Sequence, residues 1–330
     1  MSADIILVIV VATALAFDFT NGFHDTANVV AASISTRAMP PRVAVLFAAI
    51  FNFVGAFLSL KVAATVGQDI VNSSAVTMTV VFAGLIGAIA WNLATWYFGL
   101  PSSSSHALIG GLVGAAIAQS GLDGVQWHGL VHNVAIPAVA APAIAFAGGF
   151  LLLLAIYWGF VWMNPGTANR TFRLGQLASG TWVAFTHGAN DAQKTMGVIA
   201  LALFEAGHIS HFYIPTWVIV SAGVAIAAGT YVGGWRIMKT LGQRVVNMEP
   251  ASGFAAQVTG GLTIYTATKL GYPLSTTHVI SGSVMGAGAT KRLSAVRWGV
   301  AGNIVTAWLL TIPASALVAG ALYWPVQAIF

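Results

Sequence analysis

Residues 101–115 read PSSSSHALIGGLVGA, and residues 273–287 read PLSTTHVISGSVMGA. Six positions are identical between the two segments, and Ser104 and Ser105 are replaced by the hydroxyl residues Thr276 and Thr277. Both segments lie in apolar sequence. A duplicated, hydroxyl-rich segment with spaced glycines is typical of a membrane protein that builds one polar site from two broken helices. The pair therefore predicts an internal repeat with a shared central site.

The composition indicates an integral membrane protein. Hydrophobic residues make up 58% of the chain, charged residues only 6%, and the mean hydropathy is +0.84. Soluble domains carry roughly 25% charged residues. We attribute the net charge of +5 to basic cytoplasmic loops rather than to a nucleic-acid partner. The absence of cysteine excludes disulfides and thiolate chemistry, and the apolar first residues are interpreted as the first membrane span.

A second pair of related segments precedes the first pair. Residues 21–28 read NGFHDTAN and residues 187–194 read HGANDAQK, so that Gly22 aligns with Gly188 and Asp25 with Asp191. Their offset of 166 residues is close to the offset of 172 between the hydroxyl segments. The chain is therefore predicted to be a tandem duplication, with a first repeat at 1–162, a short cytoplasmic linker at 163–173 and a second repeat at 174–330.

Each repeat contains five apolar segments, which predicts an all-α polytopic membrane protein. Some of these segments exceed the length of one straight crossing, so we expect re-entrant or broken helical hairpins whose tips meet at the midplane. The segments are 3–35, 43–60, 78–99, 101–118 and 129–162, then 174–203, 213–235, 252–270, 272–290 and 297–325.

The basic loops change sides between the repeats. Arginines follow the first Asp segment, whereas the matching loop of the second half, at 205–212, has neither Lys nor Arg. In the later loops the basic residues lie in the second half, at 236–244 and 290–297, and the matching loops of the first half have few or none. By the positive-inside rule this pattern predicts an inverted repeat, with residues 36–42, 163–173, 236–244 and 290–297 in the cytoplasm and, if each segment crosses the membrane once, both termini outside.

Asp25 and Asp191 are ionisable groups at apolar depth, which costs at least ~2.5 kcal/mol and normally marks a partner or a function. Carboxylates with neighbouring amides suit Na⁺ or a proton. We therefore predict a coupling-cation site at the two carboxylates, with Asn21, Asn28 and Asn190 beside them. The alternative is a structural carboxylate that caps a broken helix or pairs with His24, His187 or Lys194.

The hydroxyl runs suit an anion. Each run follows a proline and precedes a glycine-spaced apolar stretch, as a helix N-terminus does, where free N–H groups and the helix dipole attract negative charge. The candidate anion ligands are Ser103, Ser104, Ser105, Ser275, Thr276 and Thr277. The alternative is plain N-capping, with small residues packing the helices.

Four further residues are accessory candidates. His106 and His278 end the hydroxyl runs, and a proton-handling or hydrogen-bonding role fits them better than zinc, because the chain has no cysteine and neither histidine belongs to an HxxxH pattern. Lys194 replaces Asn28 in the second copy and could pair with an aspartate or face the anion. Gln193 precedes it.

These motifs resemble those of the inorganic phosphate transporter family. NGFHDTANVVAASISTRAM and HGANDAQKTMGVIAL resemble its paired signature segments, and PSSSSH with PLSTTH resemble its paired hydroxyl segments. The resemblance covers both halves and implies a cation-coupled phosphate symporter of the inner (cytoplasmic) membrane, with an inverted-repeat fold, an elevator-like moving domain and a homodimeric state. Gln193 and Lys194 stand where the most familiar family pattern has Ala and Asn, although this form resembles bacterial members.

The resulting hypothesis is secondary active uptake of inorganic phosphate by a lipid-embedded protein that is not an enzyme and binds no nucleic acid. The coupling cation is H⁺ or Na⁺, with Asp25 and Asp191 as metal ligands if it is Na⁺. No other cofactor is expected, although phosphate could travel as a divalent-metal complex. A sulfate permease of the same family is the main alternative, because sulfate is also a tetrahedral oxyanion. An anion channel is a further alternative.

Overall fold

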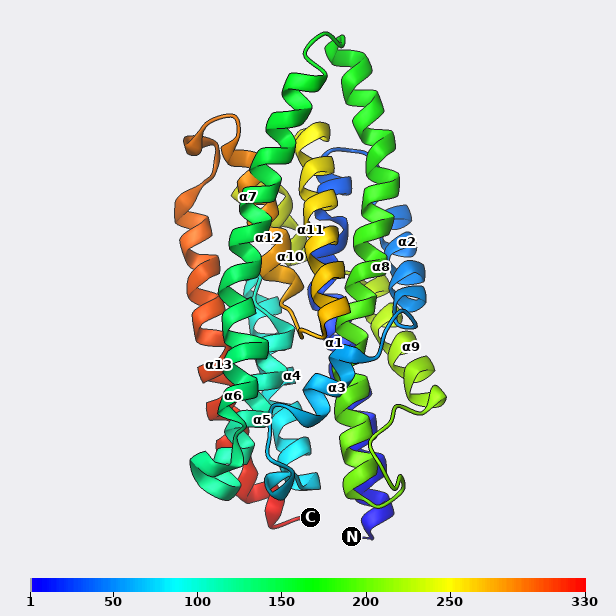
Figure 1. The fold of residues 1–330 in the computed structure, drawn as a ribbon, viewed down its shortest axis with the longest axis vertical. Helices are drawn as coiled ribbons and strands as arrows, with labels where there is room; N and C mark the ends of the chain where they lie inside the picture. Colours follow the sequence, from blue (N-terminus) through cyan, green and yellow to red (C-terminus); the bar gives the residue numbers. More distant parts are fainter. Residues whose placement is uncertain (1) are drawn as a thin grey trace.

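The structure, a computed structural model, describes residues 2–330 and is built from helices (Figure 1). Apart from one isolated bridge between Val71 and Val125, the described residues form no β-structure. The predicted all-α class is therefore confirmed. The main helices are α1 (Ala3–Ser35), α2 (Pro41–Gly55), α3 (Lys61–Gln68), α4 (Met78–Phe98), α5 (Ser104–Ser120), α6 (Trp127–Gly129), α7 (Ile136–Gly159), α8 (Pro165–Glu205), α9 (Thr216–Val232), α10 (Trp235–Lys239), α11 (Pro250–Leu270), α12 (Thr276–Ala289) and α13 (Trp298–Gln327).

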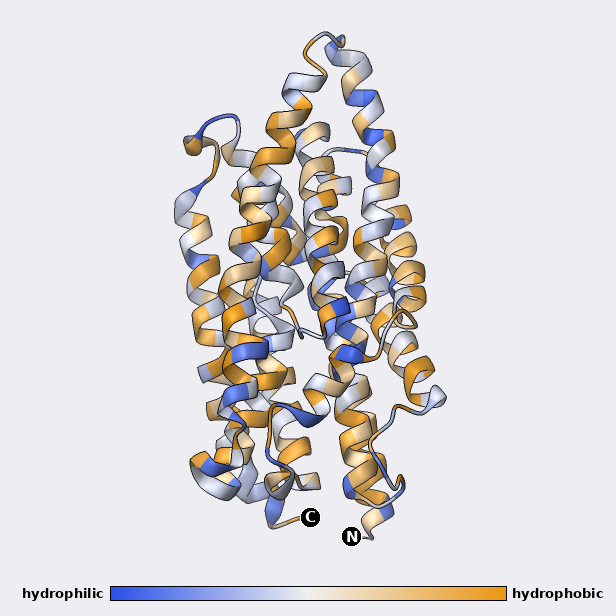
Figure 2. Ribbon diagram, in the orientation of Figure 1, coloured by the Kyte–Doolittle hydropathy of each residue, from blue (hydrophilic) through white to orange (hydrophobic). Residues whose placement is uncertain are grey.

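Several of these helices are long and apolar enough to cross a membrane. Five spans in the described chain meet both conditions, and a sixth arises if α9 and the segment after it, which bend by 58° at a short break, are one span. The protein is therefore a multi-pass membrane protein. Figure 2 shows apolar residues along most of the helices and polar residues in the middle of α8 and at its start. The predicted linker at 163–173 lies mostly in the first turns of α8.

Matched helices of the two halves pack in a reciprocal way. Helix α1 packs on α9 while its counterpart α8 packs on α2, and α5 packs on α13 while its counterpart α12 packs on α7. In Figure 1, α1 and α7 run away from the end that holds both termini, whereas α8 and α13 run back toward it. Opposite directions and exchanged partners are what an inverted repeat predicts.

Glycines allow the close approach between these partners. A Cβ at Gly22 would meet the backbone of α9, and a Cβ at Gly188 would meet the backbone of α2. The glycine pairs of the hydroxyl motifs act in the same way, because they lie against the backbone of α13 in the first half and of α7 in the second. These pairs are Gly110 with Gly114, and Gly282 with Gly286. In lipid no hydrophobic driving force brings helices together, so their association depends on the close van der Waals packing that small residues at the crossings allow.

The hydroxyl segments begin two helices whose N-termini meet. Helices α4 and α5 form one hairpin, and α11 and α12 form the other; in Figure 1 the two hairpins occupy opposite halves of the molecule. The tips touch, because the Ser105 hydroxyl donates to the Leu274 carbonyl at 2.9 Å. The sequence-based expectation that two hairpin tips meet in the centre agrees with this contact.

Candidate functional site

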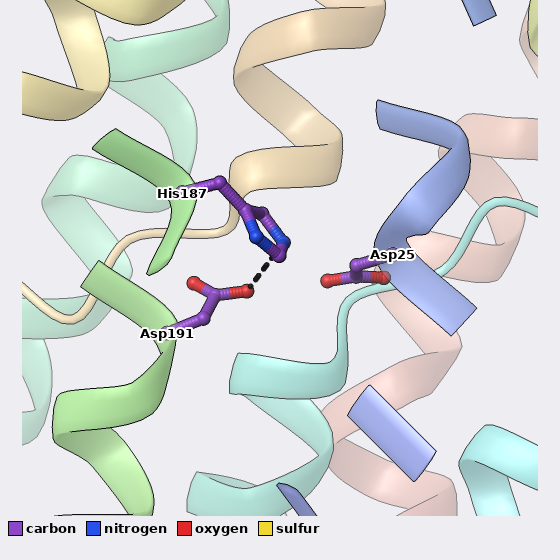
Figure 3. A group of neighbouring side chains, drawn as sticks. All are labelled: Asp25, His187 and Asp191. Atoms are coloured by element: carbon purple, nitrogen blue, oxygen red, sulfur yellow. Dashed lines mark ion pairs between the residues drawn. The ribbon is translucent and has the colours of Figure 1, made fainter. Parts of the chain in front are cut away.

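The two signature carboxylates lie together in the interior. Asp25 on α1 and Asp191 on α8 are both buried, and with His187 they offer three ligand atoms that all lie within 4.8 Å of one another (Figure 3). The Thr276 hydroxyl bridges the two carboxylates, at 3.5 Å from Asp25 Oδ2 and 3.3 Å from Asp191 Oδ2. Groups that lie 166 residues apart in the sequence therefore form one cluster.

Three of the six predicted hydroxyl ligands face this cluster. Besides Thr276, the hydroxyls of Thr277 and Ser104 both lie 3.4 Å from Asp25 Oδ1. The predicted anion ligands and the predicted cation ligands are thus not two separate sites. They form one polar cluster at the helix N-termini of α5 and α12.

The other three hydroxyls have local partners. Ser103 and Ser275 are N-caps, whose side-chain oxygens accept hydrogen bonds from the backbone N–H groups of His106 and His278, at 3.1 and 3.2 Å. The capping alternative therefore describes these two residues. The Ser105 hydroxyl accepts a hydrogen bond from the Lys194 ammonium instead of facing a carboxylate.

Asp191 is paired with basic groups on its own helix. The Lys194 ammonium, three residues later, forms an ion pair with Oδ1 of Asp191 and also donates to the Leu274 carbonyl at 2.9 Å. His187 Nε2 lies 3.2 Å from Asp191 Oδ2, one turn earlier, and its Nδ1 contacts the Asn52 amide oxygen at 3.1 Å. Of the two predicted roles for Lys194, the structure shows the ion pair.

Asp25 also has a basic partner. His24 Nδ1 lies 2.6 Å from Asp25 Oδ1, and His24 Nε2 contacts the Thr95 hydroxyl of α4 at 3.0 Å. The Ser102 hydroxyl lies 3.2 Å from the same ring nitrogen. The structural alternative, in which His24, His187 and Lys194 are partners of the carboxylates, is thus present in the structure alongside the clustering that a cation site requires.

The predicted amide ligands separate into different roles. Asn28 donates to the Thr277 hydroxyl at 2.8 Å and so belongs to the cluster. Asn190 instead fastens α8 to the end of α11, where it donates to Thr268 at 2.9 Å. Gln193 accepts from the first backbone N–H groups of α3, which it caps. Asn21 is buried, and its amide has no hydrogen-bond partner in the described chain.

The two accessory histidines lie against each other. Their rings meet edge to face with centroids 4.8 Å apart, and His278 stacks on Trp308 at 4.0 Å. Among the described residues, no hydrogen bond joins His106 or His278 to either signature carboxylate. Their position is at the contact between α5 and α12, beside the cluster.

A third buried carboxylate was missed. Asp18 on α1 is fully buried, although the sequence reasoning considered only the duplicated aspartates. A signal was present, because Asp18, Asn21 and Asp25 follow the i, i+3, i+7 spacing of one helix face. Within residues 2–330, three buried carboxylates are opposed by one buried ammonium, that of Lys194. With all three carboxylates ionised and its histidines neutral, the interior would carry an excess of negative charge.

Comparison with known proteins places this geometry among transporters. Residues 21–319 match the phosphate transporter family. The chain is 49% identical over 321 residues to a probable low-affinity inorganic phosphate transporter of Rhizobium meliloti, covering 97% of this chain and 96% of the relative. It is 44% identical over 329 residues to a protein of the same description from Bacillus subtilis, covering 99% and 98%.

A solved structure shares the fold. It is described as the sodium-dependent phosphate transporter and superposes with a TM-score of 0.91 at 25% identity, covering 98% of this chain and all of that one (100%). The helical arrangement in Figure 1 is thus one that a phosphate transporter adopts.

Proposed function

Because this chain belongs to the phosphate transporter family, whose relatives are transporters rather than enzymes, we propose that it takes up inorganic phosphate by symport with a cation, H⁺ or Na⁺, across the cytoplasmic membrane. The observation that carries the proposal is the buried cluster at the meeting hairpins, where Thr276 bridges Asp25 and Asp191. We further expect the protein to work as a homodimer in the lipid bilayer.

Electrostatics explains why phosphate needs a co-transported cation here. The described interior already holds three carboxylates against one ammonium. A phosphate anion that entered this interior alone would add like charge where the dielectric constant is low, and each uncompensated charge there costs several kcal/mol. Cations that bind the carboxylates remove this penalty. Phosphate and the cation therefore each bind more tightly when the other is already bound, which is the basis of symport.

The hydroxyls and helix N-termini supply the phosphate ligands. The first N–H groups of α5 and α12 have no acceptor within their own helices, and the helix dipoles place positive charge there. Ser104, Thr276 and Thr277 already donate toward carboxylate oxygens. When cations occupy Asp25 and Asp191, these hydroxyls can rotate and donate to phosphate oxygens instead.

A metal–phosphate complex is a second candidate for the transported species. The group formed by Asp25, His187 and Asp191 combines an imidazole with two carboxylates, a donor set that divalent transition metals accept. In that case the metal travels as cargo between the carboxylates and the phosphate. His187 is the observation that favours this form, because neither a proton nor Na⁺ requires an imidazole ligand.

The deciding experiment is uptake of radiolabelled phosphate into proteoliposomes under a pH gradient, a Na⁺ gradient or neither, with and without divalent metal. Accumulation above equilibrium under one gradient supports symport and identifies the cation. A requirement for divalent metal supports the complex. Flux that only follows the phosphate gradient would instead indicate a channel, and accumulation of sulfate without phosphate would indicate a sulfate permease.

A further inference from the structure

Asp18 is the buried carboxylate without a basic partner. Asp25 pairs with His24, and Asp191 pairs with Lys194. By contrast, Asp18 forms no ion pair with any described residue. An ionised carboxylate buried without compensation is too costly to persist. Asp18 must therefore be neutralised, either by a proton or by another bound cation.

Two neutral polar side chains adjoin this carboxylate. Asn21, one turn later on α1, and Thr195, on α8, can both donate to Asp18. Both side chains are fully buried, and neither has a hydrogen bond to any described residue other than Asp18. Lone pairs of the carboxylate and of the Asn21 amide oxygen thus remain without a donor, although most buried polar groups in proteins are satisfied.

The position of this group is distinct from the phosphate cluster. Asp18 lies two turns before Asp25 on α1, and Thr195 lies one turn after Asp191 on α8. Because α1 and α8 run in opposite directions, both steps lead toward the end of the molecule that holds the termini (Figure 1). The group lies on that side of the carboxylate pair.

Asp18 and Thr195 have no polar counterpart in the repeat, whereas Asn21 matches His187. With the offset of 166 residues, the positions that match Asp18 and Thr195 are Ala184 and Val29, which are apolar. Packing alone would favour similar residues at matched positions of a duplicated fold. The carboxylate of Asp18 and the hydroxyl of Thr195 therefore break the symmetry in a way that packing does not require.

We propose that Asp18, Asn21 and Thr195 form a binding site for one small monovalent cation, separate from the phosphate ligands and on the side of the termini. A carboxylate, an amide oxygen and a hydroxyl oxygen are hard donors, which suit Na⁺ or a hydrated proton. The inference rests on the proposed symport function and assigns the coupling cation a location. Asp191 and Lys194 lie within electrostatic reach of Asp18. A cation at Asp18 therefore offsets the electrostatic attraction of the buried carboxylates for the Lys194 ammonium. The ammonium can then attract the anion, and entry of the anion is favoured.

The test uses the full chain in proteoliposomes and compares Asp18→Asn with the parent. Accumulation of phosphate under a Na⁺ gradient and under a pH gradient is measured separately, together with exchange of phosphate across the membrane without any cation gradient. We expect Asp18→Asn to lower accumulation by at least about tenfold, the size of a typical coupling between sites, while exchange is retained. Thr195→Val should raise the half-saturating Na⁺ concentration if Na⁺ is the cation and should have no such effect if it is the proton.

Asp4→Asn is the matched control, because Asp4 lies on the same helix but is exposed. Unchanged accumulation in Asp18→Asn would overturn the proposal. A parallel loss of exchange and accumulation would also overturn it, because it would show a general need for Asp18 in folding or phosphate binding. Failure of the proposed function itself is distinguishable, because the parent protein would then not accumulate phosphate under either gradient.

Discussion

Lys194 and Asp191 form an ion pair in which both side chains are almost inaccessible to solvent. In the first repeat the position of Lys194 is occupied by Asn28, which donates to Thr277 as Lys194 donates to Ser105. The two copies thus keep the contact between this position and the opposite hairpin, but only one copy carries the charge. That substitution makes the two sides of the cluster electrostatically different.

Replacing Asp191 with Asn should leave Lys194 buried without a counter-ion. Removal of one member of a buried pair costs about 3–5 kcal/mol, so Asp191→Asn should lower the Tm in detergent and abolish coupled uptake. The double variant Asp191→Asn with Lys194→Asn, which introduces the residue of the first copy, should recover the Tm but not the uptake. A double variant no more stable than the single one would contradict the ion-pair argument.

The structure also separates hydroxyls that the sequence treats alike. Ser104 and Thr276 face the carboxylates, whereas Ser103 and Ser275 cap their helices. Ser104→Ala with Thr276→Ala should raise the half-saturating phosphate concentration at least about tenfold, because hydrogen bonds to charged groups contribute about 1.5–3 kcal/mol each. Uptake kinetics measure this change.

The cap residues provide the control for that pair. Ser103→Ala with Ser275→Ala should lower stability by about 1 kcal/mol for each lost cap, with little change in half-saturation. If both double variants weakened phosphate affinity equally, the division between ligands and caps would be wrong.

At the scale of elements, the hairpins depend on glycines that touch neighbouring backbone. A Cβ at Gly286 would press against the backbone of Phe146 on α7, while one at Gly302 on α13 would meet open space. Gly286→Ala should therefore lower the Tm, at a cost of about 1–3 kcal/mol for overpacking, and Gly302→Ala should not. Thermal unfolding of both variants measures the difference. Equal Tm values would contradict the claim that Gly286 is needed for the close packing of α12 on α7.

The main helices of the site could be predicted from the sequence because the two copies of each motif share identical residues. The paired motifs predicted two hairpins and two central carboxylates, and α5, α12, Asp25 and Asp191 lie accordingly. Side-chain roles were harder to infer, because they depend on how each helix is rotated against its neighbours. Gln193 faces the start of α3, a contact between distant segments that spacing along one helix does not show. Asp18 was missed because it has no copy in the second half.

At the scale of the whole molecule, neither half is complete without the other. Helix α5 of the first half packs on α13, and α12 of the second half packs on α7. The exchanged partners hold the two helix N-termini together at the centre, where hydroxyls from both repeats lie beside Asp25. Opposite orientation of the repeats is the condition for this arrangement, and it makes a direct prediction about the loops.

Loops at matched positions should lie on opposite sides of the membrane. Asp123, in the turn after α5, and Lys291, in the turn after α12, are both exposed. The positive-inside rule places Lys291 in the cytoplasm and the inverted repeat places Asp123 outside. The chain contains no cysteine, so Asp123→Cys and Lys291→Cys each introduce one unique thiol. In intact cells, a membrane-impermeant thiol reagent should label Asp123→Cys, and Lys291→Cys only after permeabilisation. Labelling of both from outside would rule out the inversion, and with it the symmetric approach of the hairpins from opposite faces on which the symport mechanism depends.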